Sequence, residues 1–313
     1  MPPKILVITG PTASGKTWLA VELAKRYNGE VVSADSMQIY RRMDIGTAKP
    51  TQEEMQGVPH HMLDVAGPEE AFSVARYVDM AADCVNDILS RKKLPILAGG
   101  TGLYIDSLLS GRTFAAFDES SPLRAELEAR YTKEGGKALL AELSQADPDT
   151  AARLHPNDGK RIVRALEVFL TTGKTITAHN EDTKIAPPRY TPLTLNLDFQ
   201  RREDMWDRID RRVDRMMADG LVEEVRALLD SGVPEHCTAM QAIGYKEMAA
   251  AIRGDGDTAA AAAQIKLRSR QYAKRQRTWF RRNTEAKPLL WGPVPNFTAV
   301  LHRSTEYLEE FGI

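Results

Sequence analysis

The sequence contains little cysteine. Its 313 residues include only Cys84 and Cys237. Neither has a partner at the close spacing that zinc ligands need, and two cysteines are too few for a disulfide framework. We therefore expect neither a structural zinc site nor a disulfide-stapled scaffold, and we interpret both residues as small members of the core.

Long apolar runs are also missing. No segment approaches the length needed to cross a membrane, and the N-terminus leads directly into a strand pattern without a signal peptide. We therefore expect no membrane partner and a cytoplasmic location. Few extended apolar surfaces are evident, which favours a monomer.

An excess of charge of one sign is the third feature that the sequence lacks. The 42 Lys and Arg residues nearly balance the 43 Asp and Glu residues, so the net charge is −1. No global basic field attracts nucleic acid, and such a partner would have to bind a local basic patch. The length and the ordinary composition allow one large globular domain or two.

The most informative motif lies near the N-terminus. The apolar run 5–8 leads into a loop with the P-loop pattern G-x-x-x-x-G-K-T. Its members are Gly10, Pro11, Thr12, Ala13, Ser14, Gly15, Lys16 and Thr17. Backbone N–H groups of such a loop surround phosphates, while Lys16 supplies a positive charge and Thr17 a hydroxyl for Mg²⁺. An amphipathic segment follows, as the motif requires, so we predict a polyphosphate or nucleotide site with magnesium.

Strand and helix patterns alternate over the first hundred residues, which predicts a parallel sheet flanked by helices. Strand candidates are 30–35, 60–64 and 94–98, with a helix over 73–91 that begins at Ser73. A further strand candidate is 193–198. The fold class is therefore α/β, a P-loop core with a parallel sheet.

An all-α insertion interrupts this core. Strand signals vanish near Phe114, and short helices are expected over 121–131, 134–145, 148–154 and 158–172. After residue 204 the chain is mostly helical, over 204–219, 221–231, 244–253 and 257–282. The predicted organisation is 1–114 for the first part of the core, 115–190 for the helical insertion and 191–313 for the second part of the core.

Two polar positions follow predicted strands. Asp35 ends the strand candidate 30–35, and Thr101 lies in the turn 99–102, Gly-Gly-Thr-Gly, after the strand 94–98. Ligands of open α/β sheets bind at the carboxyl ends of the strands. Asp35 is a candidate metal ligand or general base, although a carboxylate that caps the next segment is the alternative. A Gly-Thr turn in place of an acid favours group transfer over nucleotide hydrolysis.

Basic residues gather on two predicted helices. Arg208 and Arg212 share one helix face, as a second clamp on phosphate or as part of a solvated surface. The segment 266–282 contains eight cations and no acid. Its density of apparently unpaired charge, with Tyr272 and Trp279, favours a nucleic-acid contact over a membrane-surface helix or a solvated helix.

At this point the sequence resembles a known family. Blocks at 10–17, 35–40, 43–50, 59–64, 99–104, 161–167, 240–246 and 270–281 look like those of the bacterial tRNA dimethylallyltransferases, in the family's order. The resemblance implies transfer of a dimethylallyl group from dimethylallyl diphosphate to N6 of adenosine 37. That base adjoins the anticodon in tRNAs that read codons beginning with U. The implied partners are the tRNA anticodon stem-loop and dimethylallyl diphosphate, with Mg²⁺ as cofactor.

The resemblance also implies roles for individual residues. Asp35 would be the general base, and Thr101, Lys16 and Arg208 the other catalytic residues. The segments that would bind tRNA comprise Asp35, Ser36, Met37, Gln38, Thr101, Arg124, Lys160, Arg161, Ile162, Val163, Arg164, Gln241, Ala242, Ile243, Gly244, Tyr245 and Lys246. The loop 10–17 would then hold the diphosphate leaving group and not ATP.

Other functions remain open from the residues alone. A small-molecule or nucleoside kinase explains the P-loop but not the basic surfaces. A prenyltransferase acting on free adenine nucleotides and an RNA-binding P-loop protein without enzymatic activity are the further alternatives.

Overall fold

The computed structural model describes residues 2–111, 121–178, 188–254 and 256–313. The chain forms two compact units, Met1–Leu109 with Arg189–Ile313, and Ser110–Pro188. The boundaries expected from the sequence were 115 and 190, and residue 115 lies outside the described residues. The first unit carries the sheet and the second is helical.

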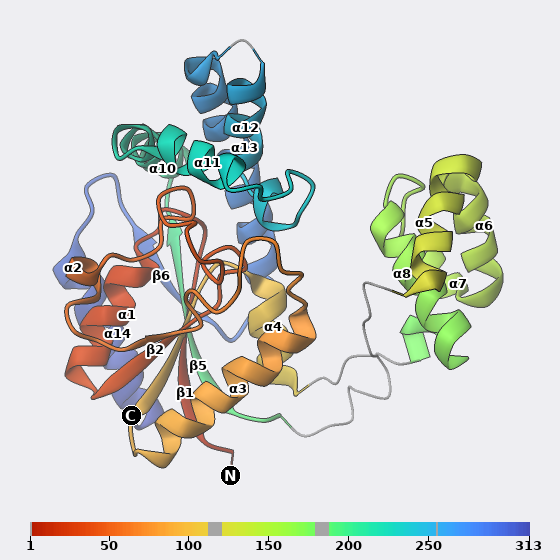
Figure 1. Ribbon diagram of the computed structural model, residues 1–313. Coiled ribbons are helices and arrows are strands. Elements are labelled where there is room, and N and C mark those ends of the chain that lie inside the picture. Colours follow the sequence, from red (N-terminus) through yellow and green to blue (C-terminus); the bar gives the residue numbers. More distant parts are fainter. Residues whose placement is uncertain (1, 112–120, 179–187, 255) are drawn as a thin grey trace. The chain divides into compact units, whose positions relative to one another are not determined.

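A six-stranded sheet forms the centre of the first unit, and every pairing in it is parallel (Figure 1). The strand order is β3-β2-β4-β1-β5-β6. The strands are β1 (Lys4–Thr9), β2 (Gly29–Ser33), β3 (His60–His61), β4 (Leu94–Ala98), β5 (Thr191–Phe199) and β6 (Lys287–Trp291). This arrangement confirms the predicted α/β fold class.

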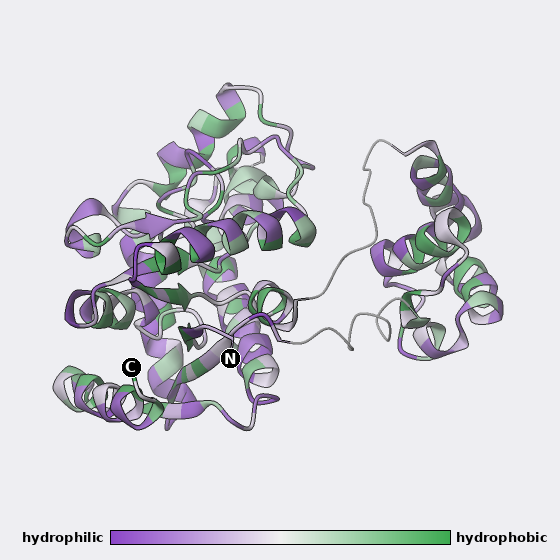
Figure 2. Cartoon of the chain, turned by 90° about the horizontal axis from the view of Figure 1, so that it is seen from below, coloured by the Kyte–Doolittle hydropathy of each residue, from purple (hydrophilic) through white to green (hydrophobic). Residues whose placement is uncertain are grey.

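Helices cover both faces of the sheet, as a parallel sheet requires. Figure 1 shows α1 (Lys16–Arg26) and α14 (Phe297–Phe311) on one face, with α3 (Val74–Ser90) and α4 (Gly102–Ser110) on the other. The residues of β1 from Ile5 to Thr9 are all buried, which explains their nearly continuous apolar sequence. Apolar residues accordingly concentrate on the strands and the adjoining helix surfaces (Figure 2).

The structure corrects some predicted elements. The strand expected over 60–64 is limited to His60–His61, because Met62 and Asp64 have φ values of 64° and 57°, outside the strand region. The described residues after 204 are mostly helical, as predicted, but the prediction missed β6. Ser73 caps α3 as predicted, since its side chain accepts a hydrogen bond from the N–H of Arg76.

A layer of helices lies over the carboxyl ends of the strands (Figure 1). It consists of α10 (Arg202–Ala218), α11 (Leu221–Asp230), α12 (Tyr245–Arg253) and α13 (Thr258–Phe280). The smaller elements of this unit are α2 (Gln52–Met55) and the 3₁₀ turn η1 (Ala239–Gln241). A separate apolar cluster that includes Tyr245 and Met248 joins the layer to the segment after β2. The helices therefore cover the edge of the sheet where the candidate site residues lie and pack against the segment after β2.

The second unit has its own small core. Its described helices are α5 (Pro122–Glu134), α6 (Gly136–Ala146), α7 (Pro148–Ala151) and α8 (Gly159–Thr172). Leu127, Leu139, Leu143 and Leu166 pack together at its centre. The helical character predicted for this region is confirmed in its described residues.

None of the helices in the described ranges is both long enough and apolar enough to span a membrane.

Candidate active site

The loop 10–15 joins β1 to α1 in a conformation that depends on small residues. Gly10, Ala13 and Gly15 have φ values of 148°, 61° and 84°. A Cβ atom on Gly10 would lie 2.4 Å from the carbonyl oxygen of Leu197, so only glycine fits there. Gly15 begins α1 without a side-chain cap, which leaves the first N–H groups of the helix suited to an anion.

Lys16 lies at the centre of this loop. Its Nζ donates to the carbonyl oxygens of Gly10 at 3.0 Å and Pro11 at 2.8 Å. Burial, and then the charge of Arg212, lower its pKa to about 7, while Asp35 acts in the opposite direction. Within the described residues, the partners of Nζ are these two carbonyl oxygens, and no acid forms an ion pair with it. The side chain is a desolvated cation that an anionic ligand would stabilise.

Two arginines of α10 reach the same region. Arg208 packs over the Trp291 ring, 5.4 Å from its centroid, and its buried Nη1 has no hydrogen-bond partner in the described part of the chain. Arg212 donates to the carbonyl oxygen of Thr47 at 3.3 Å. Burial lowers the pKa of both guanidinium groups. Arg211 instead lies on the exposed face and pairs with Asp207.

The geometry distinguishes the two interpretations of these arginines, a second clamp on phosphate and a solvated helix surface. Arg208 lies beside the loop, since a Cβ atom on Gly15 would be 4.0 Å from its Nη2. Trp291 holds the loop from the same side, because its indole N–H donates to the carbonyl oxygen of Ser14 at 2.7 Å. A solvated face describes Arg211 and not Arg208 or Arg212.

Asp35 follows β2 and faces this positive region. Its Oδ1 accepts a hydrogen bond from the N–H of Met37 at 2.9 Å, which orients the carboxylate. Its charge raises the pKa of Lys16 and Arg212, although burial outweighs it in both, and it also contributes to the raised pKa of Tyr272, about 12, for which burial is the larger cause. The carboxylate thus caps its own turn and also raises the pKa of neighbouring groups in the candidate site.

The turn 99–102 brings Thr101 next to the Asp35 segment. Thr101 Oγ1 accepts a hydrogen bond from the N–H of Ser36 at 3.0 Å. Tyr272, on α13, lies near Thr101, whose side chain lowers the pKa of the Tyr272 hydroxyl against the larger effect of burial. A Cβ on Gly99 would lie 2.1 Å from the carbonyl oxygen of Ala34, so the two segments touch through their backbones. The structure therefore assembles the loop 10–17, Asp35, Thr101 and Arg208 at one edge of the sheet.

The cations of α13 differ from the sequence-based expectation. Asp210 pairs with Arg270, Asp214 with Lys266 at 2.5 Å, and Asp198 with Arg277 at 2.7 Å. The premise that these charges are unpaired was wrong, because their acids come from α10 and β5, far away in sequence. The exposed cations that can still meet a polyanion include Arg268, Lys274, Arg275 and Arg282, together with Arg281, whose pair with Asp198 is long at 3.8 Å.

The segment 36–38 is tied into the first unit. The side-chain amide of Gln38 donates to the carbonyl oxygens of Thr47 at 3.3 Å and Ala48 at 3.0 Å, and its oxygen accepts from Ser33. Its side chain therefore supports the fold of this loop, while Ser36 and Met37 remain half-buried.

The segment 160–164 on α8 presents only part of its side chains. Ile162 and Val163 are buried in the core of the second unit, which leaves Lys160 and Arg161 exposed. Arg164 pairs with the buried Glu167 at 2.8 Å. Arg124 contacts the same carboxylate at 3.3 Å. In this segment, the side chains available for direct contact with a partner are therefore the exposed cations Lys160 and Arg161.

The segment 241–246 is divided in a similar way. The ring of Tyr245 is buried, and its hydroxyl donates to Glu224 at 2.6 Å. Glu224 also accepts from the N–H groups of Asp44, Ile45 and Gly46, which fixes that loop. Ala242 and Gly244 are buried and Ile243 is half-buried. Gln241 and Lys246 are exposed and are the side chains available to a ligand.

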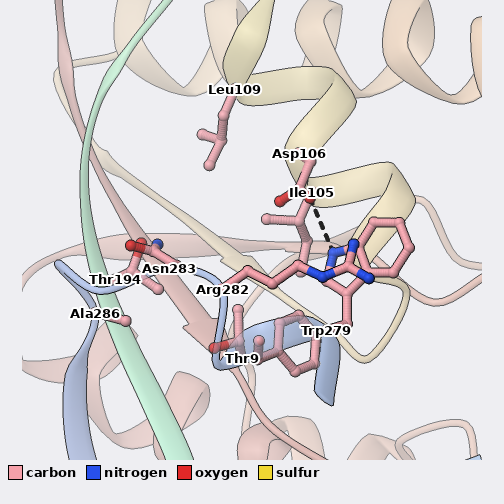
Figure 3. A pocket seen from close by; sticks show the side chains of 10 residues that line it. Thr9, Ile105, Asp106, Leu109, Thr194, Trp279, Arg282, Asn283 and Ala286 are labelled. Atoms are coloured by element: carbon pink, nitrogen blue, oxygen red, sulfur yellow. Dashed lines mark hydrogen bonds between the residues drawn. The ribbon is translucent and has the colours of Figure 1, made fainter. Parts of the chain in front are cut away.

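A cavity of about 240 Å³ opens near the turn 99–102 (Figure 3). Its walls include Thr9, Thr194, Leu109 and Asn283, and the indole of Trp279 donates to Asp106 at 2.9 Å beside it. Lys16, Asp35 and Arg208 do not line this cavity. It is therefore distinct from the assembled polar residues.

Several members of the site were not selected from the sequence. Arg212 was considered with Arg208 as a possible clamp on phosphate but was not selected as a site residue, Tyr272 was noted only as an aromatic feature, and Gln276 and Trp291 were not assigned at all. The i,i+4 relation of Arg212 to Arg208 is the one local signal among them. The described residues contain no group of three or more His, Cys, Asp or Glu side chains placed to hold a metal ion.

Comparison with known proteins shows which family this chain resembles. The family model described as IPP transferase matches residues 38–283. A tRNA dimethylallyltransferase of Acetivibrio thermocellus is 44% identical over 312 residues, 99% of this chain and 98% of the relative. One of Geobacter metallireducens is 48% identical over 299 residues, 95% of each chain.

Solved structures agree with these relatives. The full-length tRNA isopentenylpyrophosphate transferase from Bacillus halodurans is 42% identical, with a TM-score of 0.72, and the match covers 98% of this chain and 97% of that one. A eukaryotic dimethylallyltransferase acting on tRNA is 28% identical, with a TM-score of 0.83, over 98% of this chain and 78% of that one. Given this identity over nearly the full length, the chain belongs to the IPP transferase family.

Proposed function

We propose that the protein transfers a dimethylallyl group from dimethylallyl diphosphate to N6 of adenosine 37 in tRNAs that read codons beginning with U. Membership of the family and the names of its relatives support this reaction. The observation that carries the proposal is that cations suited to a diphosphate leaving group and a carboxylate suited to act as a base lie at the same edge of the sheet. Lys16 and Arg208 are desolvated cations without an ion-pair partner in the described residues, and the carboxylate of Asp35 lies close enough to Lys16 to raise its pKa against the effect of burial.

The cations suit the leaving group. As the bond between C1 of the donor and the diphosphate oxygen breaks, negative charge accumulates on the diphosphate. Lys16, Arg208 and the N–H groups at the start of α1 stabilise that charge from fixed positions. Because these groups are already desolvated, they need little reorganisation when the charge develops.

Asp35 suits the acceptor. The lone pair on the exocyclic N6 of adenosine is delocalised into the ring, so the amine is a weak nucleophile. N6 forms its bond to C1 as diphosphate departs with the electron pair of the C–O bond, and the carboxylate of Asp35 accepts the N6 proton. The hydrogen bond from Met37 to Oδ1 keeps the carboxylate oriented for this step.

Magnesium fits this site in a limited way. Thr17 offers a hydroxyl at the start of α1, but Asp198, at the end of β5, is already paired with Arg277. Mg²⁺ in such sites is held largely by substrate phosphates and water, with few protein ligands. A Mg²⁺ ion bound to Thr17 and the donor would neutralise part of the diphosphate charge.

The tRNA partner is proposed to be the anticodon stem-loop. Unpaired loop bases leave the stack at lower cost than paired ones, which allows adenosine 37 to reach Asp35. Lys160, Arg161 and Lys246 are exposed, so their side chains are available to contact phosphates.

The deciding assay supplies undermodified tRNA, dimethylallyl diphosphate and Mg²⁺ and follows the nucleoside by mass spectrometry. We expect one dimethylallyl unit on adenosine 37, and none on the same tRNA with guanosine at that position. Folded protein that yields no modified adenosine, or that transfers phosphate from ATP to a small molecule instead, would rule out the proposal and favour a kinase.

A further inference from the structure

Gln276 is a buried polar residue between two segments of the candidate site. It lies on α13, and its side chain and backbone together are only 5% exposed. Its Oε1 accepts a hydrogen bond from the N–H of Thr12 at 2.8 Å, and its Nε2 donates to the carbonyl oxygen of Gly100 at 2.9 Å. One amide group therefore joins the loop 10–17 to the turn 99–102.

The surroundings leave little freedom for this side chain. A Cβ atom on Gly100 would lie 2.3 Å from Nε2 of Gln276, so the turn approaches the amide because it carries no side chain. Buried backbone groups that lose their partner cost roughly 1–3 kcal/mol each. Both polar ends of Gln276 bind backbone groups, which makes it a connector and not a ligand for substrate.

The connection continues as far as the proposed base. Gly100, which accepts the hydrogen bond from Gln276, is followed directly by Thr101 in the turn 99–102. Thr101 accepts from the N–H of Ser36, the residue next to Asp35. The hydrogen bonds of Gln276 and Thr101, joined by the backbone between Gly100 and Thr101, thus connect the loop that would hold the leaving group to the segment that would hold the acceptor.

We propose that Gln276 is a positioning residue that sets the distance between C1 of the donor and N6 of the acceptor. This inference rests on the proposed function. Bond formation requires the two reacting atoms to approach closely and in line with the departing oxygen, and small misplacements are costly. Because the donor and the acceptor are held by different segments, the group that ties these segments together controls their alignment.

A misaligned site has a defined side reaction. Water attacks C1 in place of N6, the C–O bond to diphosphate breaks, and the products are dimethylallyl alcohol, diphosphate and a proton. The ratio of diphosphate released to modified adenosine formed therefore reports alignment. A residue that only stabilised the fold would lower both products together.

The test compares Gln276→Met with the wild-type protein. Methionine is similar in length but makes neither hydrogen bond. We expect kcat for tRNA modification to fall roughly tenfold to a hundredfold, with KM for both substrates within about threefold of wild type. We also expect the ratio of diphosphate to modified adenosine to rise above its wild-type value. The matched control is Gln264→Met, because Gln264 is exposed near the start of the same helix.

The outcomes separate the two proposals. If the wild-type protein modifies tRNA and Gln276→Met leaves both kcat and the product ratio unchanged, the inference is wrong while the proposed function stands. A rise in KM for the donor alone would also overturn it, because Gln276 would then shape the diphosphate site. If Gln276→Met does not fold, Gln276→Asn decides by the same readouts, since it keeps the amide but cannot span both segments. If the wild type modifies no tRNA, the proposed function fails, and the inference falls with it.

Discussion

Two groups of cations in this protein have opposite surroundings. Lys16, Arg208 and Arg212 lie around the loop 10–17 and form no ion pair within the described residues, although burial lowers the pKa of each. On α13, Lys266, Arg270 and Arg277 each pair with an aspartate of α10 or β5. The second group looked more conspicuous in the sequence, yet its charges are already balanced.

The difference shows what marks a binding site for an anion. A cation that has lost water and gained no acid is held at a cost in free energy, which a bound diphosphate would recover. A cation paired at the surface contributes little to stability and has less to offer a ligand. Charge density in a sequence is therefore a weaker guide than the absence of a partner in the fold.

The largest expected effect concerns the carboxylate that faces the unpaired cations. Asp35→Asn retains the oxygen that accepts the Met37 hydrogen bond but cannot accept the N6 proton. We expect kcat to fall by roughly 10²–10⁴ while tRNA affinity is retained. Single-turnover kinetics and a filter-binding assay measure the two quantities. Unchanged turnover would remove Asp35 from the role of base.

The next prediction compares neighbours on α10. Arg208→Gln removes the half-buried guanidinium beside Gly15, and we expect roughly a tenfold to hundredfold loss of kcat/KM for the donor. Arg211→Gln removes an exposed cation paired with Asp207 and is the control. Steady-state kinetics on both variants measure kcat/KM for the donor. Equal losses would mean that burial and pairing do not distinguish the two groups.

The third prediction concerns pH. Because the pKa of Lys16 is about 7, the ammonium is present below that value and is lost as the pH rises through it. We expect dimethylallyl diphosphate to bind about tenfold more weakly at pH 8 than at pH 6, since binding requires the proton to be taken up. Calorimetric titration at several pH values measures the effect. Lys16→Met corrects for ionisation of the donor itself, and a wild-type profile identical to that of this variant would contradict the prediction.

The smallest effect compares two cations on α13. Lys274→Ala removes an exposed charge, and we expect the dependence of tRNA affinity on salt to decrease by about one unit of slope. Arg270→Ala breaks the pair with Asp210 and should instead lower the free energy of unfolding by roughly 0.2–1 kcal/mol. Salt titrations and denaturant unfolding distinguish them. The comparison fails if the two substitutions change the salt dependence equally.

Much of the fold was predictable because it is encoded locally. The buried strands β1 and β4 contain short apolar runs, β5 alternates apolar and polar residues, and Ser73 caps α3 within three residues of its partner. The edge strand β6 was missed because Lys287-Pro288 opens it and its residues are mostly exposed. Such a strand is specified by pairing with β5 and not by its own pattern.

The sequence by itself determined the loop 10–17, since its glycines and Lys16 are neighbours along the chain and their chemistry needs no distant partner. It also placed Asp35 and Thr101 at strand ends, where a parallel sheet brings them to one edge. Tertiary structure alone decided which cations are paired, because Asp198, Asp210 and Asp214 reach α13 only after folding. The same is true of Gln276, whose partners Thr12 and Gly100 lie far away in sequence. Local patterns record which groups are present, whereas desolvation and pairing depend on contacts between distant segments.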